Sequence, residues 1–489
     1  MTLLVLHVSF FMPDNIKKLT AFLTKPTTED VALIERAYIF AEETHKGQTR
    51  FSGEPYFTHC VAAAQTLAEL RMDAKTIAAG LLHDTHEDGG VALSELEKRF
   101  GKEVAFLVDG VTKLGKYKYR GVVRHAESLR KLFLAVSKDT RVLVIRLADR
   151  LHNMKTLSHV REDKQKRIAL ETLEIYAPIA NRLGMGRIKG DLEDYAFSYV
   201  RPKEYAWVKT LREERAKNAT KQLSKIDRDL KKELHGESVG AVATDYRVKH
   251  LYSLYKKLLR YDKDIEKIYD IAALRIVVPT ETDCYRILGI IHALWQPLPG
   301  RIKDYIASPK PNGYQSLHTT IFTGDGGIVE IQIRTKKMHE EAEYGVAAHL
   351  AYKEAAAEPQ GKLLGKKLRW IQELVSWQKQ VSESEEFLTH LQMDFFKDRV
   401  FVFTPKGDVL DLPEESSPID FAYAVHSDLG DRLTGTKVNG KMSALDTKLK
   451  NGDIIEIITK KTGKPSAKWL PFAKTTLAKK HIKAALAKK

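Results

Sequence analysis

The sequence predicts a multidomain protein in which a helical part, an α/β part and a small β-rich part follow one another. A chain of 489 residues exceeds what one hydrophobic core usually holds, so we expect about three domains. From about Asp30 to Val200, apolar residues recur every three or four positions, as in VALIERAYIFAEETH, which indicates helices. From YDIAALRIVVP onward, β-branched runs are bounded by glycine, proline, aspartate and asparagine, which indicates strands.

We expect seven consecutive segments: an N-terminal segment at 1–26, a helical domain at 27–200, a charged helical connector at 201–240, an α/β domain at 241–355, a helical linker at 356–396, a β-rich domain at 397–461 and a basic helical tail at 462–489. The opening MTLLVLHVSFFMP is apolar but short and has no basic region before it. It is therefore a poor signal peptide and too short to span a membrane, and no later segment is long and apolar enough to do so.

The net charge of +16 and the pI near 9.4 favour polyanionic partners such as nucleotides, RNA or anionic lipid. The final stretch, TKKTGKPSAKWLPFAKTTLAKKHIKAALAKK, contains no acid, so it is either a solubilising tail or an RNA or ribosome contact. Two cysteines, Cys60 and Cys284, form neither a disulfide framework nor a zinc cluster. A reducing cytoplasm fits that content.

The stretch HDTHEDGG, residues 83–90, places two histidines and three carboxylates directly after the apolar run TIAAGLL. On a continuing helix, His83 would stack over Glu87 and Asp84 over Asp88. Two interpretations are open: a solvated helix end rich in acids, or half of a metal site.

Other segments supply the remaining ligands of a metal site. A histidine begins a helix in PYFTHC, and an aspartate follows the apolar run in VIRLADRLHNMKTL, with His152 and Asn153 one turn later. Mixed nitrogen and oxygen ligands with room for water suit manganese or a similar cation better than a thiolate zinc site. The candidate ligands are His59, His83, Asp84 and Asp149. Such a cation lowers the pKa of bound water, which leaves Glu87 and Asp88 to act as acid/base or water-positioning groups.

The motifs HKGQTRFSGEPYFTH, GLLHDTHED, GVTKL and RLADRLHNMKTL resemble the HD-type hydrolase domain of the RelA/SpoT homologue family, whose members make and destroy the alarmones ppGpp and pppGpp. The resemblance implies a manganese-dependent 3′-pyrophosphohydrolase that uses the four ligands above, with Glu87 and Asp88 handling the attacking water. It also implies that Arg50, Ser52 and Asn153 face the nucleotide. One departure is Cys60, where the family usually has proline. We expect that change to affect helix entry rather than chemistry.

A second group of residues is basic. YRVKHLYSLYKK sets Lys249, Ser253 and Lys257 four residues apart on one predicted helix face, just after Arg247. GRIKDYIASPKPNGYQSLH then supplies three cations, a turn and an aromatic ring: Arg301, Lys303, Lys310, Asn312 with its glycine, and Tyr314. Cations hold phosphates and a ring stacks on a base, so this set suits a nucleotide. The alternative is a basic surface with an ordinary hairpin turn.

Two acids inside these basic surroundings favour the nucleotide site. Asp270 opens the strand IAALRIVV, and alternation along VEIQIRT puts Glu330, Gln332 and Arg334 on one strand face. Glu330 is expected to meet Asp270 across the sheet. A carboxylate pair of this kind holds Mg²⁺ for phosphoryl transfer.

The stretches RVKHLYSLYKK, YDIAALRIVV, RIKDYIASPKPNGYQSLHTT, VEIQIRT and EYGVAAHLAYKE are similar to the synthetase domain of the same family, a nucleotidyltransferase-like fold. The resemblance implies transfer of the β,γ-pyrophosphate of ATP to the 3′-hydroxyl of GTP or GDP. Asp270 would bind Mg²⁺, Glu330 would assist the metal and activate the hydroxyl, and Tyr314 would stack on guanine. The remaining residues divide between ATP phosphates (Arg247, Lys249, Lys257) and the acceptor (Lys303, Lys310, His318), with Ser253, Arg301 and Asn312 completing the nucleotide-binding set.

Two details refine this resemblance. RIKD, at 301–304, looks like the basic variant of bifunctional members. Leu350 stands where AAHWAY usually has tryptophan, which is expected to loosen local packing.

The stretch from DRVFVFTPKGDVLDLP to KNGDIIEIIT resembles a TGS domain, a small ubiquitin-like β-grasp. In long family members this module contacts the tRNA acceptor end on the ribosome. His426 is at the matching position, so either it contacts tRNA or it is a core histidine in a passive regulatory fold. The tail KWLPFAKTTLAKKHIKAALAKK matches the segment after TGS, and we expect the distal regulatory domains of long members to be missing, naturally or by truncation.

The sequence therefore predicts a bifunctional alarmone enzyme of the stringent response, cytoplasmic, with no membrane partner. Its expected small-molecule partners are ATP, GDP or GTP, and (p)ppGpp, with Mn²⁺ at the hydrolase site and Mg²⁺ at the synthetase site. The alternatives are an enzyme with one activity in practice, or a ribosome- or tRNA-binding regulator with decayed catalysis. The acids Asp88, Asp270 and Glu330 argue against decay, because a binding module does not need them. The direction of net flux, the acceptor preference, the activating signal and the oligomeric state stay open.

Overall fold

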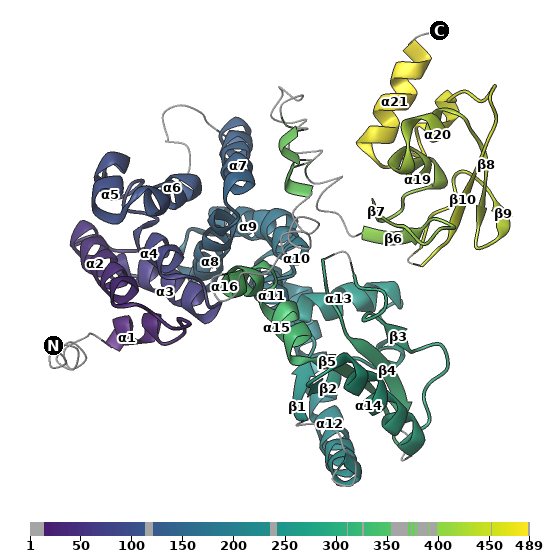
Figure 1. Ribbon diagram of the computed structural model, residues 1–489, viewed down its shortest axis with the longest axis horizontal. Coiled ribbons are helices and arrows are strands. Elements are labelled where there is room, and N and C mark those ends of the chain that lie inside the picture. The colour runs from purple at the N-terminus through teal and green to yellow at the C-terminus, as the bar shows by residue number, and fades with distance from the viewer. Residues whose placement is uncertain are drawn as a thin grey trace. The chain divides into compact units, whose positions relative to one another are not determined.

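The computed structural model describes residues 14–112, 121–234, 242–310, 312–324, 327–353, 399–450 and 452–487, with isolated positions between 370 and 391 (Figure 1). The chain forms two compact units, 1–119 with 128–375 and 120–127 with 376–489. We call them the first and the second unit. Most of the predicted linker at 356–396 and the end of GVTKL lie outside the described residues.

Helices build the first unit as far as residue 200, as predicted, and the start of one of them, at 121–127, belongs to the second unit. They are α1 (Asp14–Thr20), α2 (Thr28–Thr44), α3 (Phe57–Glu69), α4 (Ala74–Leu82), α5 (Leu93–Phe100), α6 (Lys102–Val111), α7 (Gly121–Lys138), α8 (Arg141–Lys155), α9 (Glu162–Glu171), α10 (Ala177–Arg182) and α11 (Gly186–Val200), with short turns η2 (Leu157–His159) and η3 (Thr172–Tyr176). Side chains cap the N-termini of several of these helices. Thr27 and Asp30, for example, form a capping box at the start of α2.

Helix α8 lies at the centre of this helical half. Every residue from Val142 to Leu151 is buried, including Arg146, Asp149 and Arg150. Helices α3, α4, α6 and α11 pack against it. A helix that is buried on all sides and still carries charges has to pair them inside the protein.

The predicted connector is a single 33-residue helix, α12 (Pro202–Leu234). The prediction of a helix is confirmed, but the interpretation as a solvated connector is wrong for its C-terminal part. Leu223, Ile226 and Leu230 are fully or almost fully buried in the core of the sheet. The apolar residues lie three and four apart along an otherwise charged sequence, so one face packs while the other faces water.

The α/β half contains a five-stranded sheet in the order β1-β2-β5-β4-β3. The strands are β1 (Ala243–Val248), β2 (Ala272–Val278), β3 (Lys303–Asp304), β4 (Leu317–Phe322) and β5 (Ile328–Thr335), with helices α13 (Leu251–Arg260), α14 (Glu281–Leu294), α15 (Lys336–Tyr344) and α16 (Val346–Lys353) and the short turn η4 (Ile265–Lys267). Only β2 and β5 pair in parallel; their register sets Ala273 beside Glu330. Helices α12 and α14 contribute to one core with the strands.

The helical half and the α/β half of the first unit touch at glycines. Gly345, between α15 and α16, has φ +59°, and a Cβ there would lie 2.2 Å from the carbonyl oxygen of Leu183. The next amide, of Val346, donates to that same oxygen at 2.9 Å. The Asn312 side-chain amide donates to the carbonyl of Asn181. The turn that carries Asn312 is therefore held against the end of α10.

The second unit contains a three-stranded sheet, β10-β8-β9, and a two-stranded sheet, β6-β7. Its elements are β6 (Arg399–Phe403), β7 (Val409–Pro413), α19 (Pro418–Val425), α20 (Ser427–Asp431), β8 (Leu433–Val438), β9 (Lys441–Ser443), β10 (Ile455–Thr459), η6 (Ala467–Trp469) and α21 (Thr476–Ala487).

Helix α21 is not a free basic tail. The buried carboxylate of Asp420 accepts hydrogen bonds from the amides of Lys474 and Thr475, directly before this helix. Ala478 and Ile482 are fully buried in the same core as α19. The described part of the tail is thus part of the fold, which corrects the interpretation as a solubilising extension. Among the described residues, every helix is too short or too polar to cross a lipid bilayer.

We predict that Gly345→Ala destabilises the first unit by about 2 kcal/mol, because alanine is strained at positive φ and its Cβ meets backbone. Gly289→Ala is the matched control, since Gly289 is helical and exposed and nothing lies within 4 Å of its added Cβ. That change should leave stability unchanged or raise it slightly. Thermal unfolding followed by circular dichroism measures both. Equal unfolding midpoints for the two variants would contradict the tight contact at Gly345.

Candidate functional sites

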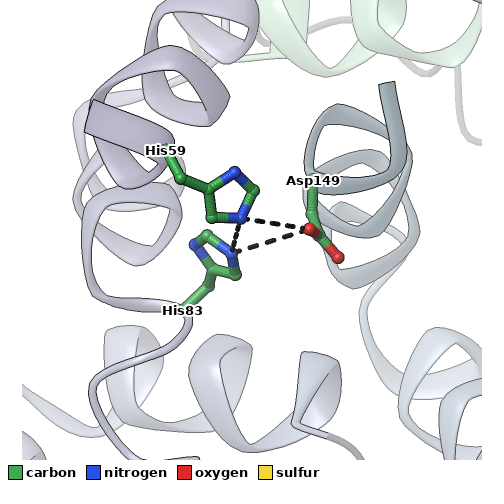
Figure 2. A group of neighbouring side chains, drawn as sticks. All are labelled: His59, His83 and Asp149. Carbon is green, nitrogen blue, oxygen red and sulfur yellow. Dashed lines mark hydrogen bonds and ion pairs between the residues drawn. The ribbon is translucent and has the colours of Figure 1, made fainter. Parts of the chain in front are cut away.

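The first candidate site is a buried cluster of His59, His83 and Asp149, whose ligand atoms all lie within 4.8 Å of one another. His59 is in the first turn of α3, His83 directly follows α4, and Asp149 is on the buried helix α8. Figure 2 shows the three side chains converging. The Nε2 atom of His59 lies 3.2 Å from that of His83 and 3.3 Å from an oxygen of Asp149.

Asp84, the fourth predicted ligand, adjoins this cluster. Its Oδ2 lies 3.2 Å from His83 Nε2 and 3.5 Å from His59 Nε2. The Nδ1 of His83 lies 2.8 Å from the carbonyl of Gly80 and donates to it, so the lone pair on Nε2 faces the cluster. Two imidazole nitrogens and two carboxylates therefore converge, which suits a borderline or hard divalent cation.

The charges in this cluster support cation binding. Burial alone would lower the pKa of His83, but Asp84 and Asp149 outweigh it and raise that pKa to about 9. Burial would raise the pKa of Asp149, but Arg146, 2.7 Å away, and His59 hold it well below its usual value. The carboxylates stay ionised and attract positive charge. A divalent cation supplies that charge in place of protons on the histidines.

Asp88 and Glu87 do not lie on a helix, which corrects the predicted stacking. Helix α4 ends at Leu82, and the chain then turns tightly, with the amide of Asp88 donating to the carbonyl of Asp84. Only glycine fits at position 89 of this turn without a shift, because a Cβ there would lie 2.6 Å from the carbonyl oxygen of Thr85. Asp88 still adjoins Asp84. The hydroxyl oxygen of Tyr56 lies 2.8 Å from Asp84 Oδ2 and 2.9 Å from Asp88 Oδ2. Glu87 is partly exposed on the same turn.

Two of the three predicted nucleotide residues are tied to this cluster. The Arg50 guanidinium donates to Asn153 Oδ1 at 2.9 Å, and the Asn153 amide donates to Asp149. Ser52 lies apart from them, on the turn beside Glu54.

Sequence reasoning missed Tyr56 and gave His152 no role. The Nδ1 of His152 contacts both Arg50 and His59, and burial together with those two groups lowers the pKa of His152 to about 3. The available signal was spacing: Tyr56 and His152 each lie three residues, about one helical turn, from a predicted ligand. Cys60 is fully buried within α3, which has already begun at Phe57.

The second candidate site lies where β2 begins. Asp270 pairs with Lys257, at 2.7 Å, and with Lys249. Burial would raise the pKa of Asp270, but these lysines outweigh it and lower that pKa to about 2. Its other oxygen, Oδ1, is buried and has no hydrogen-bond partner in the described part of the chain. An ionised oxygen of this kind fits a metal ion.

The predicted single helix face does not hold for this basic segment. Lys249 precedes α13, which begins at Leu251, and Ser253 contacts Glu193 of α11 rather than a lysine neighbour. The two lysines nevertheless meet at Asp270, because the turn into α13 brings them together. Arg247 is on β1, paired with Ala273 of β2.

Glu330 lies on β5, which pairs with β2, so it is on the strand next to the one that Asp270 precedes, as the expected meeting across the sheet requires. It accepts a hydrogen bond from the Gln332 amide at 2.9 Å, and His318 Nδ1 lies 3.3 Å away. His318 also contacts the Tyr314 hydroxyl through Nε2, at 2.8 Å. His318 therefore links the candidate base-stacking ring to the second carboxylate.

Lys310 and the turn at Asn312 lie beside this ring, whereas Arg301 lies beside another tyrosine. Lys310 Nζ lies 5.2 Å from the ring centroid of Tyr314, and burial together with Lys303 lowers the pKa of Lys310 to about 8. Asn312 accepts from the amide of Tyr314 and so shapes the turn. Arg301 lies over Tyr269, with 5.9 Å between its guanidinium carbon and the ring centroid.

Two buried arginines were not among the predicted site residues, namely Arg275 on β2 and Arg334 on β5. Arg334 is completely buried, and its Nε and both Nη atoms have no hydrogen-bond partner among the described residues. Glu343 lies 3.9 Å from Arg334, and burial lowers the pKa of Arg334 to about 10. Arg275 pairs with Asp245 at 3.2 Å and with Glu343 at 3.3 Å, whereas the unmatched donors of Arg334 favour an anionic ligand. The sequence signal was a charge inside each apolar strand, in ALRIVV and EIQIRT.

In the second unit, His426 is exposed, with 67% of its side-chain surface accessible. Its Nδ1 accepts the amide of Asp428 and caps α20. The interpretation of His426 as a core histidine is therefore wrong. Leu350, in the first unit, is partly buried on α16.

Three family models match the chain: an HD domain over residues 37–186, a region found in RelA and SpoT proteins over 246–357, and a TGS domain over 400–459. The first contains the histidine-aspartate cluster, the second contains Asp270 and Glu330, and the third contains His426. The HD match and the buried cluster together identify a divalent metal site.

The chain is also similar over most of its length to known proteins. The chain is 47% identical over 470 residues to a GTP pyrophosphokinase of Myxococcus xanthus, covering 93% of this chain and 60% of that protein. It is 46% identical over 478 residues to a guanosine-3′,5′-bis(diphosphate) 3′-pyrophosphohydrolase of Aquifex aeolicus, covering 98% and 67%. It is 43% identical over 456 residues to the bifunctional (p)ppGpp synthase/hydrolase SpoT of Escherichia coli K12, covering 93% and 65%. The chain thus spans about 60–67% of the length of these relatives.

We predict that Asp149→Asn weakens Mn²⁺ binding at least about tenfold, because the change removes a buried negative charge from the cluster. Isothermal titration of the whole chain measures the affinity. Asp163→Asn is the control, since Asp163 is exposed and pairs only with Arg161 among the described contacts. An unchanged affinity in Asp149→Asn would show that the cation binds elsewhere.

Proposed function

This chain belongs to the RelA and SpoT family, and from that premise we propose that it is a bifunctional alarmone enzyme. It makes (p)ppGpp from ATP and GDP or GTP, and it hydrolyses the 3′-pyrophosphate of (p)ppGpp. The observation that carries the proposal is the presence of two separate carboxylate sites in one compact unit, one with histidines and one with lysines.

Hydrolysis takes place at the cluster in the helical half. His59, His83, Asp84 and Asp149 hold the cation, which we assign as Mn²⁺ because the donors are two nitrogens and two carboxylates. When bound, the cation makes a water acidic and polarises a phosphoryl oxygen.

The chain's own groups complete the hydrolase site. Asp88, whose carboxylate Tyr56 holds beside Asp84, accepts the proton of the attacking water, and Glu87 on the same turn helps to position that water. Arg50 and Asn153 at one edge, with Ser52 on the adjoining turn, face the nucleotide.

Synthesis takes place at the sheet. Asp270 offers Mg²⁺ its Oδ1, which has no hydrogen-bond partner among the described residues, and the ion would neutralise phosphate charge when bound. Lys249 and Lys257 exchange part of their pairing with Asp270 for ATP phosphates, and Arg247, Arg275 and Arg334 add positive charge nearby. Arg275 and Arg334 are buried and Arg247 is partly buried, so the field of the two buried arginines on a polyphosphate is stronger than that of a solvated cation.

Glu330 acts on the acceptor. It takes the proton of the 3′-hydroxyl, whose oxygen forms a bond to the β-phosphorus of ATP while the bond to the α,β-bridging oxygen breaks and AMP leaves. Gln332 and His318 hold the Glu330 carboxylate in place. Tyr314 stacks on guanine, and Lys310 and Lys303 hold the acceptor phosphates, with Ser253, Arg301 and Asn312 as supporting groups.

We also propose that the TGS domain binds a macromolecular partner. The exposure of His426 and the basic sequence of α21 support a contact with tRNA or the ribosome. The cytoplasmic location and the stringent response belong to the same proposal.

We predict that Asp88→Asn lowers Mn²⁺-dependent ppGpp hydrolysis by a factor of about 100 or more while leaving synthesis near the parent rate, because only one site loses its base. Product release from purified whole chain, with ppGpp and Mn²⁺ in one assay and ATP and GDP in the other, measures both. Glu97→Gln, an exposed acid on α5, is the control and should change neither rate. Normal hydrolysis in Asp88→Asn would remove Asp88 from the role of base.

We also predict the opposite pattern for Asp270→Ala and Glu330→Ala, in which synthesis is lost and hydrolysis persists. Asp270→Ala removes a metal ligand and leaves Lys249 and Lys257 unpaired; Glu330→Ala removes the acceptor base. The same two assays apply, with Asp229→Ala on the exposed side of α12 as the control. If either variant forms ppGpp at the parent rate, that carboxylate has been assigned wrongly.

A further inference from the structure

Two hydrogen bonds connect Arg50 through His152 to the candidate metal ligand His59. They reach its Nδ1, the ring nitrogen that does not face the cluster. The Nδ1 of His59 lies 2.8 Å from the Nδ1 of His152, and a guanidinium nitrogen of Arg50 lies 3.0 Å from the same atom of His152. Three segments meet here: the turn that carries Arg50, the start of α3 and the C-terminal part of α8.

The chemistry of arginine fixes the direction of these bonds. A guanidinium group only donates, so the Nδ1 of His152 has to be an acceptor without a hydrogen. That atom cannot donate to His59, so the Nδ1 of His59 has to carry the hydrogen and donate it to His152. A neutral imidazole with hydrogen on Nδ1 has its lone pair on Nε2. In His59 that is the atom 3.3 Å from Asp149 and 3.5 Å from Asp84.

The two histidine ligands reach the same tautomer by different routes. His83 donates its Nδ1 hydrogen to the main-chain carbonyl of Gly80, which no substitution removes. His59 depends instead on side chains from two other segments. Because His152 is one helical turn after Asp149 on α8, a single buried helix supplies both a ligand and the group that orients another ligand.

We propose that His152 is a positioning residue that fixes the tautomer and ring orientation of His59 for cation binding, and that Arg50 acts on the cation through His152. That this change affects hydrolysis rests on the proposed function. The predicted effect on cation binding does not depend on it. Outer-sphere partners of histidine ligands typically change metal affinity 10–100-fold when removed. Arg50 thus has a role in assembling the site besides facing the nucleotide.

The test is a matched pair at position 152, studied in the whole chain. His152→Asn keeps an acceptor oxygen near the place of Nδ1, and His152→Leu has a similar shape with no acceptor. Free aqueous Mn²⁺ is measured by electron paramagnetic resonance during titration, so the readout does not need catalysis. We expect His152→Leu to weaken Mn²⁺ binding about 10–100-fold and His152→Asn to keep an affinity close to that of the parent. His159→Leu, an exposed histidine beyond α8, is the control.

Rate measurements distinguish a loss of His59 positioning from a loss of the fold. In His152→Leu, hydrolysis should fall at limiting Mn²⁺ and recover at saturating Mn²⁺, while ppGpp synthesis from ATP and GDP reports an intact fold. If His152→Leu loses synthesis as well, Arg50→Met, a change at the partly exposed end of the same chain of bonds, decides the question by the same titration.

Parent-like Mn²⁺ affinity in His152→Leu, or an equal loss in the Asn and Leu variants, would overturn the proposal. Parent-like affinity in Arg50→Met would overturn the part assigned to Arg50 and, where His152→Leu has lost its fold, the proposal as a whole. A parent protein that binds Mn²⁺ and does not hydrolyse ppGpp would instead refute the proposed function and leave the tautomer assignment standing.

Discussion

A carboxylate removed from water needs a positive partner, and both candidate sites are built around that requirement. Asp149 lies on a helix that is buried on all sides, and Arg146 pairs with it at 2.7 Å. Asp270, at the edge of a buried strand, is paired with Lys249 and Lys257. In each case the pair keeps the acid ionised while a neighbouring lone pair stays available. Each site thus keeps an ionised carboxylate where a metal ion can bind.

The helical half and the α/β half share one support, helix α11. It packs on α8, which carries Asp149, and on α13, which carries Lys257. The buried Glu193 of α11 contacts Ser253 and Lys256 of α13, and Asp194 accepts the amides of Leu251 and Tyr252 at the start of α13. Asp194 of the helical half therefore caps α13, the helix of the α/β half that carries Lys257. Such a joint is specific because an uncapped helix start and a buried unpaired acid are both unfavourable.

The structure brings the predicted residues together, but their local arrangement differs from the predicted one. His83, Asp84 and Asp88 were expected on one helix, but the helix ends at Leu82 and a tight turn brings Asp84 and Asp88 to Tyr56. Lys249 and Lys257 meet at Asp270 although only Lys257 is on α13. His318, expected to hold the acceptor, contacts Tyr314 and Glu330. Short-range spacing identified the residue types correctly, because the chemistry of each site requires them, but it could not identify contacts made across segments.

The sequence by itself determined the order of the parts, the helices up to residue 200, the alternation that places Glu330 and Gln332 together, and the residues that carry the chemistry. These depend on periodicity and side-chain type, which are local properties. Tertiary structure alone decided that α12 and α21 bury an apolar face, that Gly345 touches Leu183, and that Arg334 is completely buried with its donors unmatched by any described residue. It also decided that Arg50 reaches His59 through His152, although Arg50 and His152 are 102 positions apart. Burial and hydrogen bonding between distant segments exist only once the chain has packed, so no local pattern encodes them.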